Sequence, residues 1–231
     1  MKNTTIILKK QIKDTINNKA ILIQFLLFPI MSAIMTFSIQ TEGMPYDYFI
    51  KMFACMYIGM APIVIASGII SEEKESGALR MLMYSNVKAK EYIAGIALYI
   101  VGGCFLGCVC MAVMASYSMT QMIVFLGVSL IGMLISVMIG SIIGICASSQ
   151  MKAASWSIPV MIIFSFIPMI ASFNETIRHI GFFFYTQQIS EMIASLEPAS
   201  FQSVNMLLLI IYFILSLALF IRVYKTHLIR F

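Results

Sequence analysis

The side chains that could bind a metal or act as nucleophiles are cysteines, methionines and histidines. The chain of 231 residues has five cysteines, 20 methionines and two histidines. Cys104 and Cys108 are four residues apart, which puts both thiols on one helical face, whereas Cys110 points elsewhere. All five cysteines fall in apolar stretches, where cysteine usually behaves as a small apolar residue. The pattern favours packing over a copper site, and we predict no metal site.

The sequence lacks common motifs of an enzyme that works without a partner protein. The chain has no GxxxxGK[ST] phosphate loop, no GxSxG elbow and no HExxH motif. His179 and His227 are expected on opposite sides of a membrane, which excludes a zinc site or a catalytic triad built around both. We predict that the chain is not an enzyme and binds no cofactor itself.

The composition indicates a membrane protein. Apolar residues make up 61% of the chain and charged residues 11%, against about 25% charged in an average soluble domain. Six stretches without Asp, Glu, Lys, Arg or His are long enough to cross about 30 Å of hydrocarbon as helices. They are residues 20–39, 52–70, 92–116, 121–147, 154–172 and 204–221. We predict an all-α polytopic membrane protein in which residues 1–231 form a single transmembrane domain.

The positions of lysine and arginine predict the topology. With six spans, both termini share one side of the membrane with the loops at 71–91 and 148–153. That side holds all but two of the 15 lysines and arginines, because only Lys51 and Arg178 lie on the other. The positive-inside rule then makes both termini cytoplasmic. This bias explains the net charge of +5, so the charge does not indicate nucleic-acid binding.

The first 19 residues are polar and basic. Four isoleucines are expected near one helical face: Ile6, Ile7, Ile12 and Ile16. Residues 1–19 are therefore predicted to form an amphipathic helix on the inner leaflet, the alternative being a solvated basic tail. Residues 20–39 are too long for a signal-peptide core, so we expect a retained first span.

The segment 173–203 mixes apolar and polar residues at near-helical spacing. It predicts two short amphipathic or re-entrant helices that dip into the outer leaflet, the alternative being a loop without membrane contact. Four consecutive aromatic residues would form an interfacial anchor: Phe182, Phe183, Phe184 and Tyr185.

Prolines and glycines within the spans bear on helix shape and packing. Pro159 and Pro168 share one span and predict kinks or local unwinding. Two GxxxG spacings allow close helix approach, either within one subunit or between two. They are Gly103/Gly107 and Gly140/Gly144.

The densest charge in the chain lies at 71–91, between the second and third spans. A cytoplasmic helix this short cannot form a domain, but a partner could push it as a handle. The segment contains Glu73-Lys74-Glu75-Ser76-Gly77-Ala78-Leu79 and then Leu82, followed by Glu91-Tyr92 and Gly95. With the basic N-terminal helix and six spans, this pattern resembles the membrane subunit of ATP-binding-cassette type-2 exporters. Ser85-Asn86 stands where that family commonly has a proline, and no Asn-Pro precedes Tyr185.

The resemblance implies that two membrane subunits, identical or related, pair on two cytoplasmic ATPase subunits that bind ATP and Mg. It also implies a bacterial plasma membrane. The cytoplasmic helix would dock in a cleft of the ATPase and move with it. The residues expected to couple the two are Glu72, Glu73, Glu75, Gly77, Leu79 and Leu82.

The charge-free spans suit export of a hydrophobic or amphipathic cargo, such as an antimicrobial peptide, a drug or a lipid-like molecule. That cargo would link the protein to peptide export, immunity or antibiotic resistance, with membrane lipids around it. The alternative function is a receptor or scaffold that transports nothing. It would bind a partner through 71–91 and sense peptides through 173–203.

Overall fold

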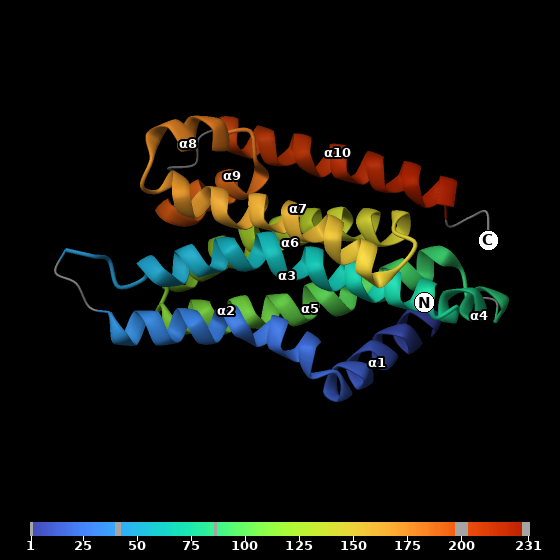
Figure 1. The fold of residues 1–231 in the computed structure, drawn as a ribbon. Coiled ribbons are helices and arrows are strands. Elements are labelled where there is room, and N and C mark those ends of the chain that lie inside the picture. Colours follow the sequence, from blue (N-terminus) through green and yellow to red (C-terminus); the bar gives the residue numbers. More distant parts are fainter. Residues whose placement is uncertain (1, 40–42, 86, 197–202, 228–231) are drawn as a thin grey trace.

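The structure is a computed structural model that describes residues 2–39, 43–85, 87–196 and 203–227. Helices and no strands make up this described part (Figure 1). The helices are α1 (Lys2–Asn17), α2 (Lys19–Ser38), α3 (Tyr48–Glu75), α4 (Ala78–Tyr84), α5 (Ala89–Met114), α6 (Met119–Cys146), α7 (Gln150–Ala171), α8 (Glu175–Gly181), α9 (Tyr185–Ser195) and α10 (Ser203–His227). Six of them, α2, α3, α5, α6, α7 and α10, are long and apolar enough to cross a bilayer, and each overlaps one predicted span. The chain therefore has the character of an all-helical, multi-pass membrane protein.

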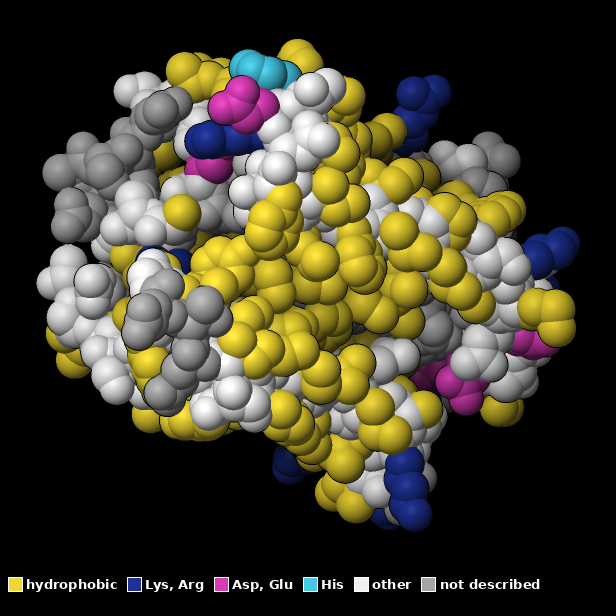
Figure 2. All heavy atoms as spheres, turned by 60° about the vertical axis from the view of Figure 1, so that its left-hand side comes forward, with side chains coloured by type: hydrophobic (Ala, Val, Ile, Leu, Met, Phe, Trp, Pro, Cys, Tyr) yellow, Lys and Arg dark blue, Asp and Glu magenta, His cyan; other side chains and the backbone are white. Residues whose placement is uncertain are grey.

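α3 is the central helix of the bundle. Within its apolar stretch 83% of the residues are buried, against 17–44% for the other five long helices. It contacts α2, α5, α6, α7 and α9, and lies between α2 and α7 in Figure 1. The peripheral helices turn apolar side chains outward, and Figure 2 shows hydrophobic side chains across the middle of one lateral face. Such a surface suits contact with lipid tails.

Glycines set the distance between α3 and its neighbours. A Cβ atom added to Gly140 of α6 would lie 2.5 Å from the carbonyl oxygen of Ile63 in α3. Gly144 faces α3 in the same way, and Gly103 and Gly107 face aromatic side chains of α2 and α3. Both predicted GxxxG pairs thus pack within this chain, where small residues let helices approach closely.

α7 runs as one α-helix through Pro159 and Pro168, so the predicted local unwinding is not present, and the kinks stay a prediction. Pro168 has no N–H, which leaves the carbonyl of Phe164 without its helical donor. That carbonyl faces Gly59 of α3, where an added Cβ would lie 2.9 Å from its oxygen. The glycine lets α3 lie directly against the free carbonyl of α7.

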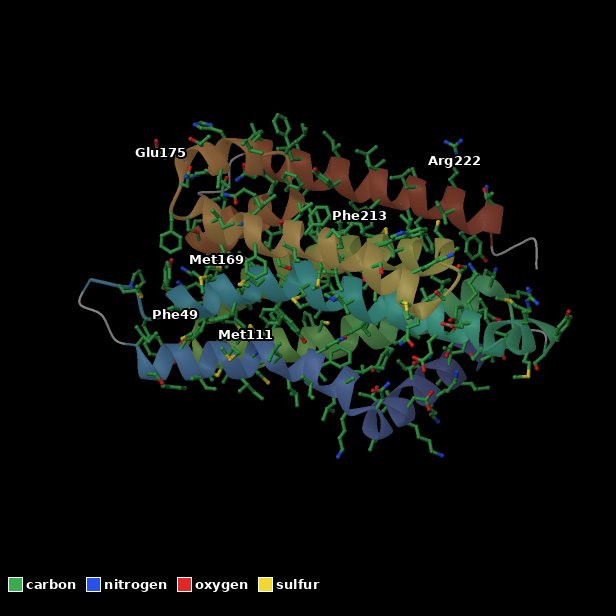
Figure 3. The ribbon with its side chains drawn as sticks, viewed as in Figure 1. Phe49, Met111, Met169, Glu175, Phe213 and Arg222 are labelled. Carbon is green, nitrogen blue, oxygen red and sulfur yellow. The ribbon has the colours of Figure 1, made fainter. Side chains whose placement is uncertain are left out.

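The bundle has two different ends (Figure 1). One end, called here the α4 end, carries α1, α4 and the loop between α6 and α7. The opposite end, called the α8 end, carries α8, α9 and the segment before α3. Arg222 of α10 lies at the α4 end and Glu175 of α8 at the other (Figure 3). At the α8 end Lys51 pairs with Asp47 at 2.8 Å.

α1 packs onto α5 through a face that the sequence pattern did not predict. Ile7, Gln11 and Thr15 are buried, and a Cβ added to Gly95 of α5 would lie 2.8 Å from the Cβ of Ile7. The other three isoleucines are exposed: Ile6, Ile12 and Ile16. The predicted common face is therefore wrong for Ile7, because packing on α5 turns it inward. Contact of the outer face of α1 with the inner leaflet stays a prediction.

Two short helices, α8 and α9, form in the predicted region 173–203, of which residues 197–202 lie outside the described residues. α9 inserts among α3, α6, α7 and α10. Its first residue, Tyr185, is fully buried, and its hydroxyl lies 2.7 Å from that of Ser136 in α6. This pair joins α9 to the core of the bundle, and entry of α8 and α9 into the outer leaflet stays a prediction.

The four predicted anchor residues have different environments. Phe183 is exposed, whereas Phe182 and Phe184 are half-buried. Since Tyr185 is buried, only the three phenylalanines have surface to offer a membrane interface, and their role as an anchor stays a prediction.

The close contact at Gly140 leads to a stability prediction. Gly140→Ala should lower the free energy of unfolding by about 1–3 kcal/mol, because its Cβ would press on the backbone of α3. The measurement is thermal unfolding of the purified chain in one detergent. Gly127→Ala on α6 is the control, since nothing lies within 4 Å of its added Cβ and alanine favours helix. Equal melting temperatures of the two variants would contradict the prediction.

Candidate functional site

The charged cluster after the second span does not form the single helix predicted over 71–91. α3 continues to Glu75, and α4 begins only at Ala78. Between them Gly77 has a φ of +74°, a left-handed conformation that glycine adopts without steric strain. This turn ends α3 and sets α4 off as a separate helix of seven residues. The segment therefore divides into the end of α3, α4 and the start of α5.

Glu73 holds α1 against the end of α3. The residue is 8% exposed. Its Oε1 accepts a hydrogen bond from Nε2 of Gln11 at 2.8 Å and pairs with Nζ of Lys10 at 2.5 Å. Because charge-assisted hydrogen bonds are stronger than neutral ones, Glu73 ties α1 to α3.

The next two residues hold the ends of α6 and α7. Nζ of Lys74 donates hydrogen bonds to the carbonyl oxygens of Ile145 (2.6 Å) and Ala147 (2.8 Å). Oε2 of Glu75 accepts a hydrogen bond from the backbone N–H of Gln150 at 2.7 Å. A cation at the end of one helix and a carboxylate at the start of another satisfy free backbone groups and complement the helix dipoles. Three consecutive side chains thus contact three different helices or their ends.

α4 has an inner and an outer face. Leu79 is 4% exposed, and Leu82 is half-buried against the same core. On the opposite side Met81 is 65% and Tyr84 87% exposed, with the exposed Arg80 beside them. Tyr, Met and Arg are enriched in protein–protein interfaces. We call Arg80, Met81 and Tyr84 the outer face of α4.

A cavity of about 330 Å³ adjoins α4. Leu79 and Met83 form its apolar part, and Lys74, Glu75 and Arg80 line it with charge. The cavity and the outer face together offer a site at the α4 end where a protein could bind by mixed apolar and charged contacts.

The predicted coupling residues are thus placed differently from one another. Glu73 and Glu75 have partners within the chain, and Leu79 and Leu82 pack inward, so the exposed contact surface of α4 comes from other residues. Glu72 is exposed and lines a groove between α2, α3 and α7. A role of these residues in coupling stays a prediction.

The outer face of α4 and the partners of Glu73 were not predicted from the sequence. Helical spacing could have shown the outer face, because 100° per residue separates Met81 and Tyr84 from Leu79. Lys10 and Gln11 carry no such signal, since they lie more than 60 positions from Glu73.

At the α8 end, polar side chains gather around Glu191 of α9. Its carboxylate accepts hydrogen bonds from Asn205 (3.1 Å), Gln187 (3.3 Å) and Arg178 (3.5 Å). A carboxylate only accepts, so both amide N–H₂ groups must face it. The cluster joins α8, α9 and α10.

The thiols considered for metal binding differ in exposure, because Cys110 of α5 is exposed. Cys104 and Cys108 are fully buried on α5. Within the described residues, no three side chains of His, Cys, Asp and Glu are grouped so that they could hold a metal ion.

Comparison with known proteins leaves the family of the chain open. No protein-family model and no curated protein matches it. The features of the chain that bear on its function are therefore the six long helices and the contacts at the α4 end.

The attachment of α1 through Glu73 is testable by hydrogen exchange. Glu73→Ala removes the ion pair and the hydrogen bond from Gln11, worth about 1–2 kcal/mol together because Lys10 is partly exposed. Backbone amides of α1 should then exchange roughly tenfold faster in nanodiscs. Glu72→Ala is the matched control, since the neighbouring carboxylate is exposed. Equal exchange in both variants would show that Glu73 does not hold α1.

Proposed function

We propose that this chain is the membrane subunit of an ATP-binding-cassette type-2 exporter. It would pair with a second membrane subunit, identical or related, on two ATPase subunits that bind ATP and Mg. The observation that carries the proposal is the outer face of α4, where Met81 and Tyr84 stand exposed at the end of the bundle rich in lysine and arginine. Large apolar side chains at a polar end fit a protein partner better than lipid or water.

The contacts around α4 suit the transmission of force. Leu79 anchors α4 in the core, and the turn at Gly77 joins it to the central helix. The end of that helix is in turn bound to α1, α6 and α7 through Glu73, Lys74 and Glu75. A partner that pushes α4 would therefore move several spans together, because packed helices shift as rigid elements.

The proposed orientation places the α4 end in the cytoplasm of a bacterial cell, because most lysines and arginines lie there. The predicted spans contain no Asp, Glu, Lys, Arg or His, whereas ion-coupled transporters usually bury such groups. The energy for transport would then come from the ATPase. A hydrophobic or amphipathic cargo, such as a peptide, a drug or a lipid-like molecule, suits the apolar helices.

Substitution of the outer face tests this proposal. The tagged chain, purified in mild detergent from its source cells, should bring with it an ATPase with a GxxxxGK[ST] loop that hydrolyses ATP. The double variant Met81→Ser and Tyr84→Ser should retain about a tenth of that ATPase or less, because central exposed aromatic and apolar residues dominate interfaces.

Met119→Ser is the control, since Met119 is also exposed (75%) but begins α6, away from α4. Equal recovery of the ATPase by both variants would reject the role of the outer face. A chain that brings no ATPase in detergent or nanodiscs would favour the receptor or scaffold function instead.

A further inference from the structure

A groove of about 370 Å³ runs along α3 between α2 and α7. Its volume falls within the range of about 300–1,000 Å³ that is typical of small-molecule sites. Along α3 it is lined by residues four positions apart: Met60, Val64, Gly68 and Glu72. At 1.5 Å per residue, these positions form one stripe about 18 Å long on a single helical face. α2 and α7 lie on either side of α3 in Figure 1.

The groove changes from polar to apolar along its length. Glu72, Asn18 and Gln150 line it near the α4 end. Met60 and Met161 line it towards the middle of the bundle, with other apolar side chains of α3 and α7 between. A molecule that fills the groove would need a polar group at one end and an apolar body at the other.

The charge of the groove is negative. Among the described residues that line it, Glu72 alone is charged, although the whole chain has a net charge of +5. Within the described part of the chain, the Glu72 carboxylate has no hydrogen-bond or ion-pair partner. A carboxylate beside an apolar groove attracts a cation and repels the phosphate of a lipid headgroup.

Gly68 keeps the middle of the groove open. Nothing lies within 4 Å of a Cβ atom added there, unlike the glycines that face neighbouring helices. A larger side chain at this position would therefore fill the groove without pressing on another helix.

We propose that this groove binds an amphipathic organic monocation. Its charged group lies at Glu72, and its apolar body lies against Met60 and Met161, whose flexible side chains adapt to varied shapes. The inference rests on the proposed function as an exporter and narrows its cargo from any amphipathic molecule to a cationic one.

The probe for this site is decyltrimethylammonium below its micellar concentration, because its cationic head and apolar tail match the two ends of the groove. The control is decyl sulfate, an anion with the same tail. Binding is measured by equilibrium dialysis with the full chain in phosphatidylcholine nanodiscs, and binding to empty discs is subtracted. The cation should bind saturably and the anion should not.

Two variants should weaken binding of the cation. Glu72→Gln should do so about tenfold, the effect of losing one charged contact. Gly68→Leu should abolish saturable binding by filling the groove. The matched controls are Glu175→Gln at the α8 end and Gly102→Leu on α5, where an added Cβ also meets nothing within 4 Å. Both controls should bind as the unaltered chain does.

Several results would overturn the proposal. These are no binding above empty discs, equal binding of the anion, or unchanged binding in Glu72→Gln or Gly68→Leu. If the probe binds in phosphatidylcholine discs but not in phosphatidylethanolamine discs, the groove would be assigned to a phosphatidylethanolamine lipid. A dimer that Gly68→Leu dissociates would assign it to a second copy of the chain. Because the assay uses the chain alone, a failure to recover an ATPase would reject the exporter while leaving the site measurable.

Discussion

Helices in a bilayer gain little free energy by burying apolar side chains against one another, because lipid tails are as apolar as the helices themselves. The packing of this chain therefore depends on places where two backbones come close. Gly59, Gly140 and Gly144 provide such places around α3, where an added Cβ would lie within 3.0 Å of a neighbouring carbonyl oxygen. Contacts along both α6 and α7 hold α3 in place, and its burial follows from them.

The last turn of α3 also connects this helix to three neighbouring elements. Glu73, Lys74 and Glu75 point in different directions from that turn, as consecutive residues on a helix must. Each meets a different element: α1, the end of α6 and the start of α7. Three residues in a run of charges that looks like a solvated surface therefore connect elements within the chain, and the outer face of α4 lies exposed beyond them.

Both proposed sites adjoin α3. The outer face of α4 follows directly from the turn at Gly77, and the groove uses the stripe of α3 that neither α2 nor α7 covers. Glu72, which lines the groove, is the neighbour of Glu73, which holds α1. Movement of α4 by a partner would thus act on the helix that forms one wall of the groove. Under the proposed function, this contact would connect the ATPase to the groove for the cargo.

The order of residues along the chain by itself determined three properties: the number of long apolar helices, the absence of Asp, Glu, Lys, Arg and His within the predicted spans, and the uneven distribution of lysine and arginine. These properties depend only on local runs of residues. Local periodicity could also have separated the two faces of α4. Only the tertiary structure decided that Ile7 packs inward, that Glu73 binds Lys10, and that Gly68 faces open space while Gly140 faces α3. These outcomes depend on contacts between helices distant in sequence, for which no local pattern of residues carries a signal.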